Sequence, residues 1–293
     1  MMNKNYLQLF ANETFASDLA PAISVDFASR LANNITELQE ALGVTEMMEM
    51  GAGNTIKVYK MSQANTPEQV AEGAEIPLTE IKREVVATYD IVLNKYRKNT
   101  SAEAIQKVGR DLAINQTDDK LISGIQKDIK KNLYKMLEGG TGTASGATLQ
   151  STLANCWGEI KKAFEDVDAS PVYFVSSEDV AEYLGTAQIT LQNAFGMSYI
   201  NDFLGLGTVI VSPVLTKGKV IATAKENLNG AYAPASSGDV AQSFGLTSDE
   251  TGYVGVTHVV KSDNATIDTL AMCGVVFFPE YIDGVIVGSI TQA

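Results

Sequence analysis

The chain has 293 residues and a mass of 31.3 kDa, and its 22 basic residues against 35 acidic ones give a net charge of −13. That balance argues against sequence-specific binding of nucleic acid, which needs a basic face, and against docking on anionic membranes. One His and two distant cysteines, Cys156 and Cys273, exclude multi-His metal sites, zinc spacings and a disulfide framework. The N-terminus lacks the apolar core of a signal peptide, so we expect a soluble protein made in a reducing cytoplasm, with both thiols buried.

Residues 1–53 are interpreted as an N-terminal arm. Apolar residues recur every three or four positions from 22 to 42, which predicts a helix that ends at Gly43. The residues before that helix predict an extended segment. Such a segment buries little surface by itself, so we expect it to lie against a neighbour.

Residues 54–98 predict a two-stranded protrusion. Alternating apolar residues mark strands at 54–61 and 84–93. The long stretch between them is charged and is interrupted by proline and glycine. Because an isolated hairpin is only marginally stable in water, we expect the protrusion to rest on another subunit.

A long helix is predicted over 100–138, with a break or bend at Gly109. We interpret Asp118 and Asp119 as residues that cap the positive end of its main stretch. The opposite end is rich in lysine, as the helix dipole favours. These lysines are Lys127, Lys130, Lys131 and Lys135. The glycine-rich residues 139–149 predict a flexible linker and a domain boundary.

The rest of the chain predicts an α+β plan with local strands and no βαβ series. Helices are expected at 149–167 and 177–184, around a buried strand at 171–177. Two strands around a Pro/Gly turn are expected within 207–223. Three further strands are expected at 253–260, 266–272 and 281–290.

No catalytic, cofactor or metal motif stands out. The glycines at 140, 142 and 146 follow a helix and do not match a phosphate-binding fingerprint. His258 lies in an alternating strand without a nucleophile motif, so we interpret it as structural. The acidic residues Glu165, Asp166 and Asp168 lack calcium-loop spacing, and Trp157 has the helical spacing of a core residue. We therefore expect no cofactor, no metal and no enzyme activity.

Four segments, in this order, resemble the HK97-fold major capsid proteins of tailed bacteriophages. VAEGAEIPLTEIKREVV (70–86) is similar to the outer part of the family's extended loop, and IQKDIKKNLYKMLEGGTG (125–142) to the end of its spine helix. Residues 203–232 resemble the central strands of the axial domain, with a Gly-x-Val-Ile-Val-Ser strand (207–212) and a Lys-Gly turn. GVVFFPEYIDGVIVGSI (274–290) resembles the final strands.

The resemblance implies an HK97-like capsid fold of the α+β class with five parts. These are an N-terminal arm (1–53), an extended two-stranded loop (54–98), a peripheral domain with a long spine helix (99–147), an axial domain (148–265) and C-terminal strands that return to the peripheral domain (266–293). It implies hexamers and pentamers that close an icosahedral head around double-stranded DNA. The implied partners are a portal, a separate scaffold protein, in some members a decoration protein, and DNA bound without sequence specificity. The implied location is the virion, assembled in the cytoplasm of a bacterial host.

The resemblance also marks two candidate sites. Contacts between subunits are expected from the loop residues Glu72, Gly73, Glu75, Lys82 and Arg83, among which two acidic and two basic side chains carry opposite charges. The inner face of the shell is expected to carry the basic helix with Lys127, Lys130, Lys131 and Lys135. Some family members form Lys–Asn crosslinks, and Lys57, Lys60 and Lys82 are candidates. Because no motif selects a partner Asn, we expect noncovalent assembly.

One departure from the family is the short stretch before the first loop strand, which leaves no room for a large scaffolding segment. We therefore expect a separate scaffold protein, or a scaffold segment already removed. Three alternatives stay open: an encapsulin-type nanocompartment, an enzyme with a nonstandard site in the axial domain, and a monomeric binding module.

Overall fold

The computed structural model describes residues 16–44, 47–63, 81–165, 168–185, 191–194, 197–235, 238–248 and 250–291. Its helices are α1 (Ala16–Leu42), α2 (Ala102–Val108), α3 (Arg110–Leu137), α4 (Leu149–Ala163), α5 (Ser177–Leu184) and α6 (Gly238–Phe244), with the 3-10 turns η1 (Lys225–Asn227) and η2 (Ile282–Gly284). The strands are β1 (Met47–Glu49), β2 (Thr55–Gln63), β3 (Ile81–Asp90), β4 (Asn94–Ser101), β5 (Gly142–Gly146), β6 (Pro171–Ser176), β7 (Gln192–Ala194), β8 (Met197–Ile200), β9 (Thr208–Ser212), β10 (Lys219–Ala224), β11 (Leu228–Ala233), β12 (Val254–Lys261), β13 (Thr266–Pro279) and β14 (Ile286–Ile290).

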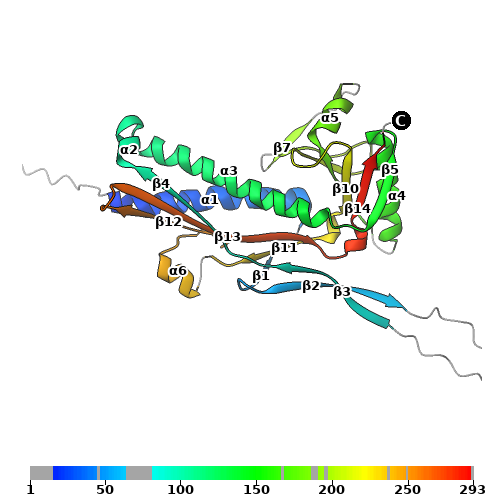
Figure 1. Cartoon of the computed structure of the whole chain (residues 1–293), viewed down its shortest axis with the longest axis horizontal. Coiled ribbons are helices and arrows are strands. Elements are labelled where there is room, and N and C mark those ends of the chain that lie inside the picture. Colours follow the sequence, from blue (N-terminus) through cyan, green and yellow to red (C-terminus); the bar gives the residue numbers. More distant parts are fainter. Residues whose placement is uncertain are drawn as a thin grey trace, which may run out of the picture.

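The first sheet is built around the long strand β13, which lies along the middle of the molecule (Figure 1). Its residues 266–273 pair antiparallel with both β12 and β4, and its residues 274–279 pair with β11. The short strand β1 adds to β11 in parallel. Residues near the start, middle and end of the chain therefore share one sheet.

The two faces of β13 are covered by different elements, because successive side chains of a strand point to opposite faces. Cys273, Val275 and Phe277 belong to the hydrophobic cluster that contains α1 and α3. Val276 and Phe278 belong to the cluster that contains the bases of β2 and β3. The buried stripe of α1 and most of that of α3 therefore lie on one face of the sheet and the base of the β2–β3 ribbon on the other, while Met136 near the end of α3 packs against the ribbon's cluster.

Helix α1 packs on the first sheet through a fully buried stripe with helical spacing. The stripe consists of Phe27, Leu31, Ile35, Leu38 and Leu42. The predicted helix is confirmed, and Gly43 follows its end with a positive φ of 74°. The helix begins at Ala16, however. The expectation of an extended segment before residue 22 is therefore wrong for residues 16–21.

The break predicted at Gly109 is confirmed: this residue, at φ 87°, separates α2 from α3. Helix α3 has 28 residues and is about 42 Å long at 1.5 Å per residue. Asp118 is its ninth residue and is fully buried, so the interpretation of Asp118 and Asp119 as helix caps is wrong. The helix starts a full two turns earlier, where the sequence offered only weak apolar periodicity.

The second sheet has seven strands in the order β5-β14-β10-β6-β9-β8-β7. Helix α4 packs against β5, β10 and β14, and helix α5 packs against β6 and β9. Every residue of β6 is buried, as expected for a central strand covered on both faces. Ser176 caps α5, since its hydroxyl accepts from the backbone N–H groups of Glu178 and Asp179.

Two expectations for this sheet are corrected. Residues 142–146 form the strand β5, which pairs in parallel with β14, so the glycine-rich stretch is not a flexible linker throughout. The strands β9 and β10 exist but do not form a hairpin. They flank β6, to which β9 is parallel and β10 antiparallel. Parallel pairing therefore occurs in a chain for which only local strands were expected.

The strands β2 and β3 form a separate two-stranded ribbon whose far end extends away from the body (Figure 1). Both strands were predicted. Near the body, Val58 and Tyr89 pack with Ile91 and Phe278, which fixes the base of the ribbon to the first sheet. In the part of the chain that the structure describes, neither strand pairs with any other, so the ribbon has two open edges.

Side-chain positions confirm one expectation and overturn another. Both cysteines are free and buried, and burial raises the pKa of each thiol to about 12. Trp157 was expected in the core but is 39% exposed, because the buried stripe of α4 runs through Leu153, Cys156 and Ile160 instead. The division of the chain into an arm, a loop, two domains and C-terminal strands stays a prediction.

Candidate functional site

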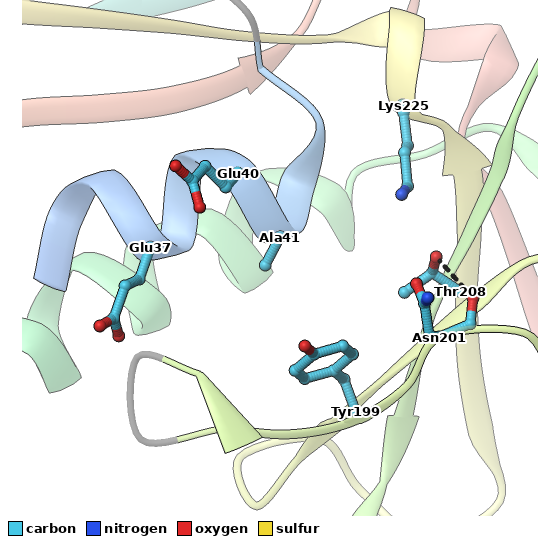
Figure 2. A pocket seen from close by; sticks show the side chains of 7 residues that line it. All are labelled: Glu37, Glu40, Ala41, Tyr199, Asn201, Thr208 and Lys225. Carbon is cyan, nitrogen blue, oxygen red and sulfur yellow. Dashed lines mark hydrogen bonds between the residues drawn. The ribbon is translucent and has the colours of Figure 1, made fainter. Parts of the chain in front are cut away.

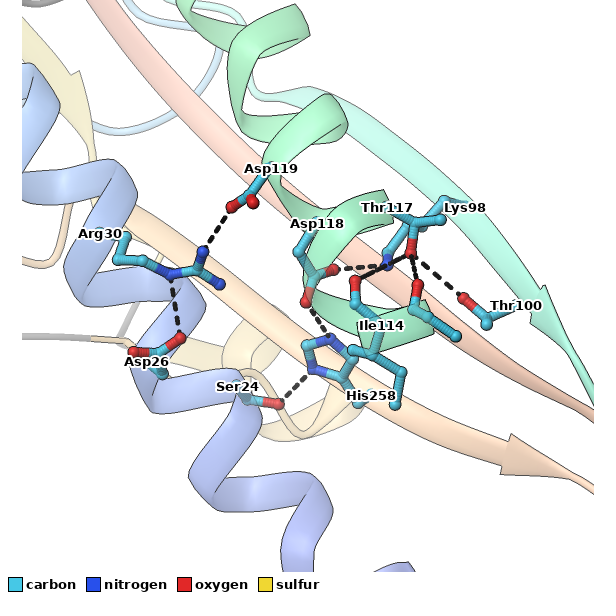
Figure 3. A network of polar contacts seen from close by, with 11 residues as sticks. Ser24, Asp26, Arg30, Lys98, Thr100, Ile114, Thr117, Asp118, Asp119 and His258 are labelled. Atoms are coloured by element: carbon cyan, nitrogen blue, oxygen red, sulfur yellow. Dashed lines mark hydrogen bonds and ion pairs between the residues drawn. The ribbon is translucent and has the colours of Figure 1, made fainter. Parts of the chain in front are cut away.

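A buried polar junction joins α1, α3, β4 and β12 (Figure 3). The Ser24 hydroxyl lies 2.8 Å from Nδ1 of His258. Nε2 of the same ring lies 3.6 Å from the carboxylate of Asp118, which in turn is 2.6 Å from Nζ of Lys98. The four elements that supply these groups are far apart in the sequence, and only the fold brings them together.

The junction contains a Ser, a His and an Asp, the residue types of a hydrolase triad, but its surroundings are those of a core. Ser24 is 2% exposed, His258 7% and Asp118 0%. A nucleophile must reach its substrate, and this hydroxyl is enclosed between α1 and β12. His258 is buried and lies within hydrogen-bonding distance of Ser24, as expected of a structural residue, and its structural role stays a prediction.

Charge inside the junction is balanced by pairing. Burial lowers the pKa of Lys98, and the hydrogen bond and attraction from Asp118 oppose that effect. The Lys98 ammonium also donates to the hydroxyl of Thr117, at 2.5 Å, and to the backbone carbonyl of Ile114. At the exposed edge, Arg30 of α1 bridges Asp26 on its own helix and Asp119 on α3. The junction thus fixes α1 to the body of the subunit.

A polar cavity of about 190 Å³ lies between the end of α1 and the second sheet (Figure 2). Glu37 and Glu40 line it from α1, and Lys225 faces it from η1. The hydroxyl of Thr208 donates to the backbone carbonyl of Asn201, so it is already engaged. The other lining residues are Ala41, Tyr199 and Asn201.

The ribbon is anchored near its base by an ionic contact. Lys60 of β2 forms an ion pair with Asp283 of η2, whose carboxylate also accepts a hydrogen bond from Thr141 at 2.5 Å. The hydrogen bond from Lys60 lowers the pKa of Asp283, and the bond from Thr141 lowers it further. This contact links the ribbon to the connection between the two sheets.

The outer face of the ribbon is partly apolar and exposed. Tyr59 and Val85 are paired across the two strands and are 38% and 51% exposed. The guanidinium of Arg83 lies 3.6 Å from the centre of the Tyr59 ring, a cation–π contact. Val86 adds a third exposed apolar side chain beside a register shift in the pairing. Such a face is suited to contact with another protein surface.

The two sets of candidate residues differ in what the structure shows. Glu72, Gly73 and Glu75 lie outside the described residues, so their expected contacts stay predictions. Lys82 and Arg83 lie on β3 with exposed side chains.

The lysines of the basic helix lie on different sides of α3. Lys127, Lys131 and Lys135 are exposed, whereas Lys130 is half-buried, and burial lowers its pKa.

No group of three or more His, Cys, Asp or Glu side chains among the described residues is arranged to hold a metal ion. No helix in the same part of the chain is both long enough and apolar enough to cross a membrane.

The sequence matches no family model and no curated protein. Its structure, however, is similar to solved shells. It matches a capsid subunit of cyanophage A-1(L) with a TM-score of 0.58, at 12% identity, over 88% of this chain and 93% of that one. It matches the virus-like particle from Pyrococcus furiosus with a TM-score of 0.54, at 12% identity, over 90% of this chain and 98% of that one. It matches an encapsulin from Synechococcus elongatus with a TM-score of 0.54, at 12% identity, over 84% and 85%. The chain therefore has the HK97 fold, which the sequence resemblance predicted.

Proposed function

We propose that this chain is a structural subunit that assembles with copies of itself into a closed shell. The observation that carries the proposal is the ribbon. It extends from the body with Tyr59, Val85 and Val86 exposed, and it pairs with no other described strand. A two-stranded ribbon with an apolar outer face is marginal in water, and a neighbouring subunit would stabilise it.

We infer further that the shell is the icosahedral head of a tailed bacteriophage, built from hexamers and pentamers around double-stranded DNA. Similarity to the cyanophage capsid subunit over most of both chains supports this proposal. The net charge of −13 also suits it, because an acidic wall repels DNA on average and lets a dense genome pack without adhering. A portal, a separate scaffold protein and a decoration protein would be its partners.

An encapsulin-type nanocompartment is the second candidate. The similarity to the Synechococcus elongatus encapsulin, at a TM-score of 0.54, supports this candidate through the shared fold. The two candidates differ in contents, because a head holds nucleic acid and a nanocompartment holds protein cargo.

The contents of the particles distinguish the phage head from the nanocompartment. Particles from the native source are treated with nuclease, then opened, and their nucleic acid and protein are measured. Protected double-stranded DNA of uniform length supports the phage head. A co-purified enzyme with no protected DNA supports the nanocompartment and rejects the phage head.

A further inference from the structure

The turn between β8 and β9 holds a leucine in an unfavourable backbone conformation. Leu204 has a φ of 55°, in the left-handed region that is costly for a residue with a Cβ atom. Its side chain is exposed by 56%. Glycine adopts positive φ freely and occupies positions 205 and 207 of the same turn, at 74° and 132°. The turn therefore carries an exposed apolar side chain at a position whose backbone favours glycine.

Hydrogen bonds fix this turn on the second sheet. The N–H of Phe203 donates to the carbonyl of Gly207 at 2.9 Å, and the N–H of Leu206 donates to the carbonyl of Phe203 at 2.9 Å. The Phe203 side chain, next to Leu204, is 1% exposed and belongs to the hydrophobic cluster of this sheet. Because the turn is held from both sides, Leu204 is covered only when another molecule lies against it.

The other residue of this kind has a purpose inside the subunit. Among the described residues, Leu204 and Ala265 are the two with a positive φ that are not glycine. Ala265, at φ 51°, lies in the turn between β12 and β13, and its carbonyl accepts the N–H of Ala102 at 3.0 Å. Its own side chain is a single methyl group. Leu204, by contrast, holds a large apolar side chain out toward solvent.

A second exposed leucine lies at the same end of the sheet. Leu191 is 37% exposed and directly precedes β7, whose first residue, Gln192, pairs with Tyr199 near the end of β8. The turn with Leu204 begins just after β8 ends. Strand β7 is the edge of the seven-stranded sheet, and its outer side pairs with no described strand. An open edge beside exposed apolar side chains is suited to contact with another protein chain.

The charge of the turn also favours a protein partner. Its one ionisable side chain, Asp202, accepts a hydrogen bond from the N–H of Gly205 at 3.0 Å. Residues 201–208 contain no basic residue, so the turn lacks the cations that nucleic acid or an anionic membrane would require. Two copies of this chain, each with a net charge of −13, repel one another on average. An apolar tip lets them approach with little added repulsion.

We propose that Leu204 is an anchor of a contact between two copies of this chain, inserted into an apolar hollow of the second copy. The fixed turn holds the side chain outward before contact, so little conformational freedom is lost when it is buried. The strain that the turn imposes on one subunit is offset in the assembly. This contact rests on the proposed shell function and is separate from the contact expected of the β2–β3 ribbon.

The first test compares substitutions in the full chain. Leu204→Gly removes the side chain and also the backbone strain, so the subunit should fold with a Tm within about 2 °C of the wild type. Without its anchor, it should need an about tenfold higher concentration to form shells, measured by sedimentation velocity. Ala265→Gly makes the same backbone change and should assemble like the wild type. Leu204→Met keeps a large apolar side chain and should also assemble.

The second test identifies the partner by crosslinking. Leu204→Cys is labelled with a benzophenone maleimide. Cys156 and Cys273 are buried, and burial raises the pKa of each thiol to about 12, so the label is directed to the new thiol. Illumination of assembled protein should give a product of twice the subunit mass of 31.3 kDa. The same labelled protein, illuminated below the concentration of assembly, should not give it.

Normal assembly of Leu204→Gly beside wild-type shells would overturn the inference and leave the proposed function standing. So would a crosslink that stays within one chain or joins a different protein. Loss of the native circular dichroism spectrum in Leu204→Gly would make Leu204 a folding residue and would overturn it as well. A wild type that forms no shells at any concentration would overturn the proposed function, and this contact with it.

Discussion

The Ser24 hydroxyl lies 2.8 Å from Nδ1 of His258, a hydrogen bond that spans 234 residues of sequence. Behind the imidazole, the buried carboxylate of Asp118 pairs with Lys98. This junction therefore makes the N-terminal helix α1 part of the folded body. A substitution that leaves one of its charged groups unpaired should therefore lower the stability of the whole subunit.

Replacing Asp118 by Ala should strongly destabilise the subunit. The change leaves the Lys98 ammonium, whose side chain is 12% exposed, without its counter-charge. Removal of one partner of a buried ion pair costs about 3–5 kcal/mol. Urea unfolding followed by circular dichroism measures the loss. Asp119→Ala is the matched control: its side chain is 65% exposed, and we expect a change of about 0–1 kcal/mol. Equal losses for both variants would contradict the account.

Asp268 should contribute to acid unfolding. Its carboxylate is paired with Lys261 at 2.8 Å and Arg97 at 2.5 Å, and these contacts lower its pKa from 3.8. Below that value the unfolded chain takes up a proton that the folded chain does not. The stabilisation is therefore complete above pH 3.8 and is lost as the pH falls toward the folded-state pKa.

The measurement is the urea midpoint at pH 7, 5, 4 and 3. The wild type should lose stability more steeply below pH 4 than Asp268→Asn, which has no such carboxylate to protonate. Asp263→Asn, an exposed position in the adjacent turn, should follow the wild type. A slope for Asp268→Asn that matches the wild type would reject this role.

The Lys60–Asp283 pair should hold the ribbon to the body. Lys60→Ala removes the contact at a partly exposed site, so we expect little change in global stability. We expect instead faster amide hydrogen exchange in β2 and β3, because the base of the ribbon would open more often. Lys57→Ala, which changes an exposed lysine of the same strand, is the control. Exchange that is identical in both variants and the wild type would show that the pair does not anchor the ribbon.

Val85 should be needed for assembly and not for folding. It is 51% exposed on the outer face of the ribbon, so Val85→Lys should leave the circular dichroism spectrum unchanged. A lysine buried at a subunit contact without a partner is costly, so the variant should stay unassembled in sedimentation experiments. Val85→Ile keeps the apolar surface and should assemble. Normal shells from Val85→Lys would exclude this face from the contact.

The fold was predictable where local pattern and tertiary packing agree. The strands β2 and β3, the helix α1 and the break at Gly109 all carry periodicity or a glycine at the required position. Pairing was not predictable in the second sheet: β9 and β10 look like a hairpin along the sequence, but β6 enters between them. The short strand β5 was missed because its glycines and serine resemble a linker, and only the edge of β14 makes it a strand.

The site was less predictable than the fold. The junction of residues 24, 98, 118 and 258 has no sequence signal, because its members are far apart and each has an ordinary local context. Asp118 resembled a helix cap until the structure placed the helix start two turns earlier. The lysines of α3 were visible from the sequence, whereas the division into a solvent-facing row and a half-buried Lys130 needed the orientation of the helix.

Electron microscopy of the purified full chain, combined with sedimentation velocity, tests the central claim of self-assembly most directly. The account predicts closed polyhedral shells, or rings of five and six subunits, that form as the protein concentration rises. A single species at the subunit mass of 31.3 kDa at every concentration, with a native circular dichroism spectrum, would contradict it.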